Sequence, residues 1–99
     1  MVRLTLTALL VVAASQAAVA QVDTFNDINN IRKATPSCQA NPSSPIRGRV
    51  SGNTTGPLDE NIPVSFVGCF KTMRECERWR GQASRIIDST IIQYSCAPR

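Results

Sequence analysis

The chain has 99 residues, four cysteines, no histidine and a formal net charge of +4. This length predicts one small basic domain, and the lack of histidine excludes histidine-based acid–base catalysis and histidine ligation of metals. Fifteen of the first 20 residues are hydrophobic, so the composition separates a short leader, residues 1–20, from a domain of residues 21–99.

Residues 1–20 have the features of a signal peptide. Arg3 precedes a short apolar stretch, and Ala18 and Ala20 are the small residues of a signal-peptidase site, which predicts a mature start at Gln21. The alternative is a membrane anchor, which needs about 20 consecutive apolar residues. The uninterrupted apolar stretch is only about half that length. The sequence therefore predicts a periplasmic or secreted protein with no membrane span in the mature chain.

All four cysteines, Cys38, Cys69, Cys76 and Cys96, lie in the predicted mature chain. An even number of cysteines in a short exported chain is typical of disulfides. The spacing does not match the close ligand pairs of a zinc site, and there is no C-x-x-C redox motif. We therefore expect two disulfides, each contributing roughly 3–4 kcal/mol to stability, and neither a metal nor a cofactor.

Residues 23–33 predict a short helix, because Phe25, Ile28 and Ile31 recur at a spacing of three and would share one face. Residues 34–45 are rich in proline, serine and asparagine, which predicts a loop. A disulfide at the cysteine of this loop would attach it to the core.

Residues 46–50 predict a short edge strand, with Arg47 and Arg49 projecting to one side. Residues 51–61 combine glycine, proline and small polar residues, which predicts a second loop. Residues 21–61 are therefore expected to be loop-rich.

Residues 62–97 are expected to form a strand–helix–strand core. Residues 62–70 are rich in β-branched and aromatic side chains, which favours a buried strand. The alternation of such a strand places Val64, Phe66 and Phe70 on one face.

Residues 72–75 have the pattern of a capping box, so a helix should begin at Met73 and continue to about Ile87. One face of this helix gathers apolar side chains, which predicts that it packs on the sheet. The residues of this face are Cys76, Trp79, Ala83, Ile86 and Ile87. Trp79 is therefore expected in the core rather than as a binding anchor.

Residues 90–96 predict the last strand, with Ile92, Tyr94 and Cys96 on one face and Tyr94 in the core. The fold class is accordingly α+β. We expect a small disulfide-stapled domain with one main amphipathic helix packed on a short β-sheet.

The lengths of these elements favour one disulfide pairing. The helix rises about 16 Å after Cys76 and the strand returns about 20 Å to Cys96, so the two cysteines should lie at the same level. Pairing Cys76 with Cys96 leaves Cys38 for Cys69. Cys69 with Cys96 is the alternative.

The remaining residues do not form a catalytic motif. No two carboxylates are spaced to work as an acid–base pair, and cysteines in disulfides lack the thiol of a nucleophile. We predict no catalytic, cofactor-binding or metal-binding residue and expect the protein not to be an enzyme.

One charged pattern lies on the predicted helix. Arg74, Arg78 and Arg85 fall within about 40° of one another opposite the apolar face, with Lys71 just before the helix near the same line. We name these four residues the basic ridge. An anionic partner would relieve the repulsion between Arg74 and Arg78, whereas the alternative is a solvated surface. Nucleic acid is not expected as a partner, because exposed aromatics between the arginines are lacking.

The segment GCFKTMRECERWRGQASRIIDSTIIQYSCA, residues 68–97, contains the motif C-F-x-T-x-x-x-C. A threonine-capped helix carries its second cysteine, and a final strand carries the last one. This pattern resembles the C-terminal part of small exported disulfide-containing alphaproteobacterial proteins of unknown function. The resemblance covers about 30 residues and implies export and a disulfide-stapled fold rather than an activity.

Together these features predict a non-enzymatic envelope or secreted interaction protein. Its basic ridge would contact an envelope component or another protein. The alternative is a small inhibitor or effector that presents the loop of residues 51–61 to a protein target, because a loop held on a disulfide scaffold is pre-organised for binding.

Overall fold

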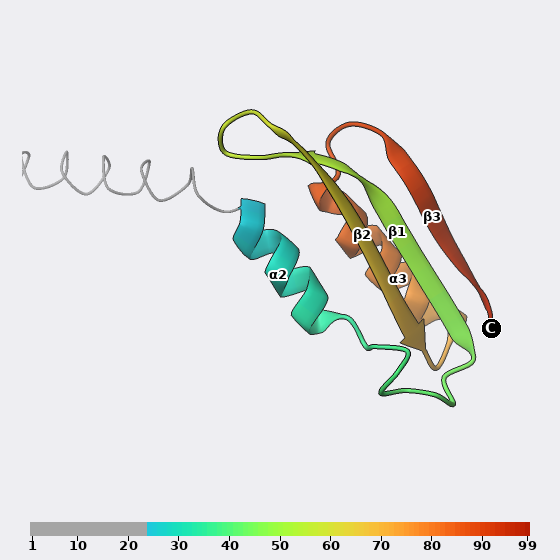
Figure 1. The fold of residues 1–99 in the computed structure, drawn as a ribbon. Coiled ribbons are helices and arrows are strands. Elements are labelled where there is room, and N and C mark those ends of the chain that lie inside the picture. The colour runs from blue at the N-terminus through green and yellow to red at the C-terminus, as the bar shows by residue number, and fades with distance from the viewer. Residues whose placement is uncertain (1–23) are drawn as a thin grey trace, which may run out of the picture.

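The computed structural model describes residues 24–99, and the predicted signal peptide lies outside them. A three-stranded antiparallel sheet with strand order β2-β1-β3 packs against helices, so the fold is α+β as expected (Figure 1). The elements in chain order are α2 (Thr24–Ala34), β1 (Ile46–Thr55), β2 (Asn61–Phe70), α3 (Met73–Ala83), the 3-10 turn η1 (Ser84–Ile86) and β3 (Ile91–Pro98).

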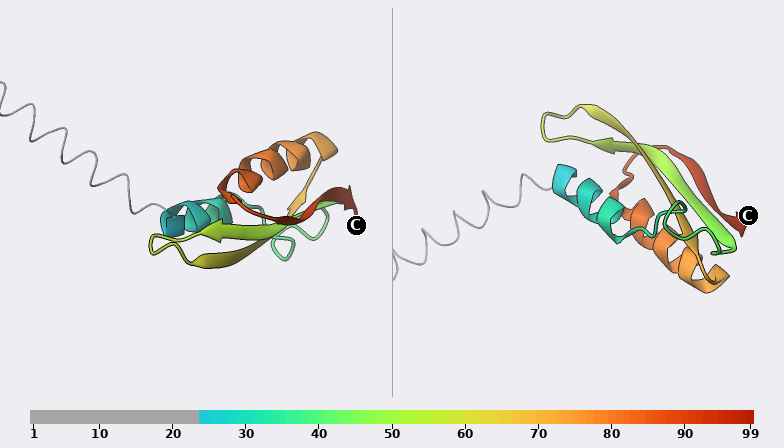
Figure 2. Two further views of the ribbon diagram at one scale, coloured as in Figure 1. Left: turned by 90° about the horizontal axis from the view of Figure 1, so that it is seen from above. Right: turned by 60° about the horizontal axis from the view of Figure 1, so that its bottom comes forward.

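The two helices lie on the same side of the sheet, and the connection of residues 35–45 passes to the other side (Figure 2). Side chains alternate between the two faces of a strand, and the even-numbered residues of β1 and β2 face the helices. The buried cluster accordingly contains Ile28, Val50, Val64, Phe66, Phe70, Cys76, Trp79 and Ala83. Most of this cluster belongs to the predicted strand–helix core of residues 62–97.

Strand β1 differs most from the sequence prediction. It covers ten residues rather than residues 46–50, and it is the central strand rather than an edge. Residues 51–55, predicted as loop, pair with β2, so the segments outside helices and strands within residues 24–61 are 35–45 and 56–60. As predicted, Arg47 and Arg49 project together, on the face away from the helices.

A close approach of α3 explains why β1 contains glycine in its interior. A Cβ atom at Gly48 would lie 2.6 Å from Cζ3 of Trp79 and 2.7 Å from Sγ of Cys76. Only a residue without a side chain leaves room there for the helix. Gly52, which the sequence predicts in a loop, is also a packing position in the central strand, because a Cβ atom there would lie 2.9 Å from Cγ2 of Ile87.

The helix α3 begins where the sequence predicts. The Thr72 hydroxyl accepts a hydrogen bond from the Glu75 amide at 3.2 Å, which satisfies one of the free amides of the first turn. The α-helix ends at Ala83, earlier than predicted, and continues as the 3-10 turn. The Ser84 hydroxyl donates to the carbonyl of Gly81 at this transition.

The structure pairs Cys76 with Cys96 and Cys38 with Cys69, the pairing that the sequence favours. The first disulfide joins α3 to β3. The second attaches the connection of residues 35–45 to β2. Two disulfides are characteristic of an oxidising, extracytoplasmic environment.

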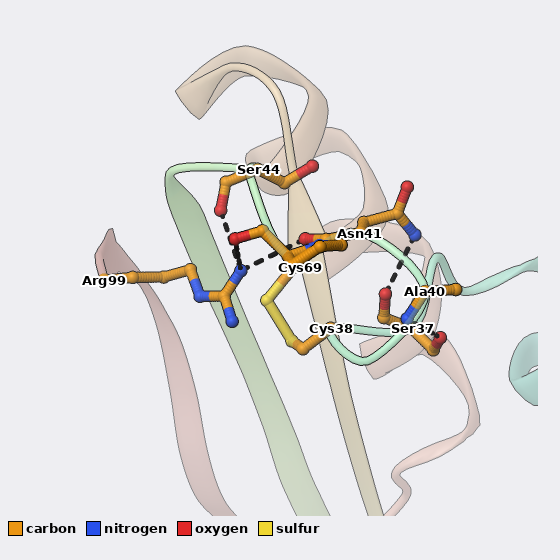
Figure 3. The surroundings of a disulfide bond; sticks show 8 residues. Ser37, Cys38, Ala40, Asn41, Ser44, Cys69 and Arg99 are labelled. Carbon is orange, nitrogen blue, oxygen red and sulfur yellow. Dashed lines mark hydrogen bonds between the residues drawn. A yellow bond between two sulfur atoms is a disulfide. The ribbon is translucent and has the colours of Figure 1, made fainter.

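Figure 3 shows how the connection is held on the far side of the sheet around the disulfide of Cys38 and Cys69. One guanidinium nitrogen of Arg99 donates to the carbonyls of Asn41, Pro42 and Ser44, each at 3.1 Å. The amide of Arg99 also donates to Pro45. The end of β3 thus fixes the loop that covers the end of β2.

Candidate functional site

The basic ridge lies on the outer side of the helix layer. Lys71, Arg74, Arg78 and Arg85 are all exposed, whereas Cys76, Trp79 and Ala83 on the other side of α3 are buried. Arg74 and Arg78 lie one turn apart on the same helical face. The segment therefore has one apolar face against the sheet and one cationic face toward solvent.

Arg85 lies in a different secondary-structure element from the one expected. The sequence predicts a continuous α-helix there, but the α-helix ends at Ala83 and Arg85 belongs to the 3-10 turn η1. A 3-10 turn advances by about 120° per residue instead of 100°, so the two steps from Ala83 add about 40° to the expected position of Arg85. Arg85 then lies about 60° from Arg74 and about 20° from Arg78 around the axis, so it stays on the outer side with both of them.

The second predicted contact surface is shorter than expected. Only residues 56–60 form the turn between β1 and β2, because residues 51–55 and Asn61 belong to strands. The Gly56 amide donates to the Glu60 carbonyl at 2.8 Å, and the Asp59 amide donates to the Gly56 carbonyl at 3.0 Å. These bonds fix a compact tip on which the Leu58 side chain is 86% exposed.

Trp79 is buried, as predicted, rather than presented to a partner. Its ring lies 5.1 Å from that of Phe70. Its indole N–H donates to the Thr35 hydroxyl at 2.8 Å, and that hydroxyl donates to the Ile31 carbonyl at 2.6 Å. Trp79 therefore links α3 to the end of α2.

A shallow cavity of about 230 Å³ lies between the end of α2 and the outer edge of β2, lined by Arg32, Thr35, Ser37, Ser65, Phe66 and Val67. Most of its polar groups already have partners. Arg32 lies 5.2 Å from the Phe66 ring centroid and donates to the Ser65 carbonyl at 3.5 Å. The Thr35 hydroxyl serves Trp79, and the Ser37 hydroxyl accepts from the Ala40 amide. Few groups remain there to recognise a ligand.

Strand β3 exposes apolar side chains that the sequence analysis does not predict. Tyr94, expected in the core, is 45% exposed, and Ile92 is 68% exposed. The reason is strand order, because β3 is an edge strand and β1 takes the centre. The predicted buried strand of residues 62–70 is likewise an edge strand with one exposed face.

Within residues 24–99, no group of three His, Cys, Asp or Glu residues could hold a metal ion. No helix in that part of the chain is long and apolar enough to cross a membrane.

Comparison with known proteins gives no relative. No protein-family model matches the chain, and neither a curated protein nor a solved structure is significantly similar to it. The surfaces described above are therefore the basis for a functional proposal.

Proposed function

We propose that this chain is an exported interaction protein without enzymatic activity, whose basic ridge contacts an anionic envelope component or an acidic protein. The observation that carries the proposal is the exposure of Lys71, Arg74, Arg78 and Arg85 on the side of α3 opposite its buried face. The signal-peptide pattern and the resemblance to exported disulfide-containing proteins support the periplasm or the extracellular medium as its location.

The packing of α3 makes this surface suitable for contact. Helix α3 is fixed by the disulfide to β3, by the Thr72 cap and by Trp79, so the spacing between Arg74 and Arg78 is set before binding. A pre-organised surface loses less conformational entropy on association than a mobile one. An acidic partner also removes the repulsion between like charges four residues apart.

The test compares two double variants with the same loss of charge. Arg74→Ala with Arg78→Ala removes two charges from the ridge, and Arg47→Ala with Arg49→Ala removes two from the opposite face of the sheet. Oxidised protein carrying each pair is used to capture partners from an envelope extract at low and high salt. The ridge variant should lose a partner that the sheet variant keeps.

Salt dependence gives the second readout. Screening shortens the range of charge interactions from about 10 Å at 0.1 M salt to about 3 Å at 1 M. Binding through the ridge should therefore weaken steeply as salt rises. Equal capture by both double variants, or capture that resists salt, would contradict the proposal.

A second function is favoured by the exposed Leu58. A compact tip with one protruding leucine resembles the binding loop of a small inhibitor or effector, held by the hydrogen bonds of Gly56, Asp59 and Glu60. Leu58→Ala should then remove a protein partner without affecting salt-sensitive binding. The ridge double variant is the control, because it should keep such a partner.

A further inference from the structure

The outer edge of β3 has free hydrogen-bonding groups. In an antiparallel sheet, alternate residues turn both backbone groups toward the same neighbour. The Asn53 amide donates to Thr90 and its carbonyl accepts from Asp88, so the odd-numbered residues of β1 face β3. These residues pair with Gln93, Ser95 and Ala97. The amides and carbonyls of Tyr94 and Cys96 therefore point away from the sheet.

The same edge is apolar. Ile91, Ile92 and Tyr94 are all exposed, and no charged residue occurs between Ile91 and Pro98. Proteins usually protect an edge strand with charged residues, proline, a bulge or a covering segment. Strand β3 has a register irregularity opposite Ser51 and Gly52, at its beginning, and a proline only at its end. The stretch between them can accept another strand.

The guanidinium of Arg80 lies beside this edge. The guanidinium carbon of Arg80 lies 4.4 Å from the centroid of the Tyr94 ring. Within residues 24–99, the Nε atom of Arg80 is buried and has no hydrogen-bond partner. A strand added to β3 would lie about 4.8 Å away, so its helix-side side chains would pass next to Tyr94 and Arg80. A carboxylate at that position would be a favourable neighbour for the guanidinium.

These charges favour a partner other than a second copy of the chain. Antiparallel pairing of two β3 edges places both helix layers on the same face, which brings the Arg80 side chains of the two copies toward one another. Each copy also has a net charge of +4. Like charges at such a junction oppose pairing, whereas an extended segment with an acidic residue complements it.

We propose that β3 is an acceptor edge to which an extended segment of another protein, carrying Asp or Glu, adds as a fourth strand. The backbone of Tyr94 and Cys96 supplies the hydrogen bonds, and Arg80 selects the acidic side chain. This mode of recognition uses main-chain bonds for affinity and side-chain contacts for specificity. It goes beyond the proposed function, because it requires neither the basic ridge nor the tip at Leu58.

The experiment uses the oxidised full chain and a display library of random linear peptides of nine residues. Selection should enrich peptides that combine β-branched residues with at least one Asp or Glu. A selected peptide is then synthesised together with a matched form in which Gln or Asn replaces the acidic residue. We expect the neutral form to bind about tenfold more weakly.

Two protein variants distinguish the contribution of Arg80 to peptide binding from that of the basic ridge. Arg80→Gln should remove the preference for the acidic peptide, whereas Arg78→Gln removes the same charge from the outer helix face and should leave it unchanged. Hydrogen exchange gives the position of the bound strand. The peptide should slow exchange at the Tyr94 and Cys96 amides at least tenfold and leave the outward Val67 amide of β2 unaffected.

Several results would overturn the proposal. These are a selection without enrichment, enriched peptides without acidic residues, protection at Val67 instead of Tyr94, or equal effects of Arg78→Gln and Arg80→Gln. In the absence of peptide, protection of the Tyr94 and Cys96 amides should rise only if two copies pair; protection that increases with protein concentration would therefore identify a second copy as the occupant. The double variant Arg74→Ala with Arg78→Ala should still bind the peptide, so this proposal and the proposed function can fail independently.

Discussion

The two outer edges of the sheet differ in how they are covered. At the edge of β2 the Cys69 amide donates to the Pro36 carbonyl at 3.0 Å, and Arg32 reaches the Ser65 carbonyl. Pro63 also interrupts the row of amides on that edge. At the edge of β3, within residues 24–99, no corresponding bond satisfies Tyr94 or Cys96. The edge of β2 is thus interrupted by contacts with its own chain, whereas the edge of β3 is open.

This difference follows from the connection between α2 and β1. Residues 35–45 run along β2 and are fixed there by the disulfide of Cys38 and Cys69 and by Arg99 (Figure 3). The other disulfide joins Cys96 to α3 above the sheet, so it anchors β3 without covering its edge. The disulfide of Cys38 and Cys69 therefore holds the connection against β2, whereas the disulfide of Cys76 and Cys96 holds the accessible strand β3 to α3.

The largest effect should come from removing the support of β3. Cys76→Ser should destabilise the domain by roughly 3–4 kcal/mol, because the open chain regains the entropy that the cross-link removes. Urea unfolding of oxidised protein measures this loss. Hydrogen exchange should accelerate first in β3, since β3 then loses its covalent attachment to α3.

Cys38→Ser is the matched comparison. The sequence separation of 31 is similar in its entropic effect to the separation of 20 for the other pair, so the loss of stability should also be about 3–4 kcal/mol. Hydrogen exchange in the Cys38→Ser variant should accelerate in residues 35–45 rather than in β3. Four free thiols in native exported material, counted by alkylation and mass, would contradict both disulfides.

A methyl group at Gly48 should disturb the close packing of α3 on the central strand. Gly48→Ala places a Cβ against Trp79 and the disulfide of Cys76, and such overpacking costs about 1–3 kcal/mol. Gly81→Ala is the control, because nothing lies within 4 Å of a Cβ at Gly81. It should stabilise the helix by about 0.5–1 kcal/mol. Thermal unfolding showing the same sign for both variants would refute this packing argument.

Removing the hydrogen bond between Trp79 and Thr35, next to the end of α2, should lower the stability of the domain. Thr35→Val keeps the shape of the side chain but removes the acceptor of the indole N–H. The expected loss is about 1 kcal/mol, because water can reach part of this half-buried site. Chemical unfolding followed by tryptophan fluorescence measures it. Thr90→Val changes an exposed threonine whose hydroxyl makes no hydrogen bond within residues 24–99 and serves as the control; an equal loss there would argue against the link.

Local signals explain what the sequence predicts correctly. The start of α3 follows from Thr72 and Glu75, and its buried face follows from the spacing of Cys76, Trp79 and Ala83, all within one segment. The disulfide pairing follows from the rise of a helix and the return of a strand. The start of the helix and its buried face need only residues that are close in the chain, whereas the pairing of Cys38 with Cys69, 31 residues apart, follows only by elimination.

Strand order and edge exposure are properties of the whole fold. Gly52 looks like a loop residue until Ile87 is placed against it, and the packing role of Gly48 is clear only once α3 lies on the strand. The alternation in β3 identifies a strand but does not say which neighbour covers Tyr94. The basic ridge is predicted because it is a helical pattern, whereas the open edge of β3 is missed because it depends on β1 lying in the centre.

The smallest change in stability and the sharpest test of the two edges should come from single lysines. Ile92→Lys places a charge on the exposed side of β3 and should change the unfolding free energy by no more than about 0.5 kcal/mol. A lysine on an edge strand hinders pairing because its charge must remain hydrated. In about 1 M salt, which screens the repulsion between copies, the isolated wild-type protein should therefore aggregate faster under agitation than this variant. Val67→Lys makes the same change at an exposed position of β2, on an edge that is already interrupted at Pro63, Ser65 and Cys69, and should give little protection. Light scattering distinguishes the two, and equal protection by Val67→Lys would mean that the edges do not differ in accessibility.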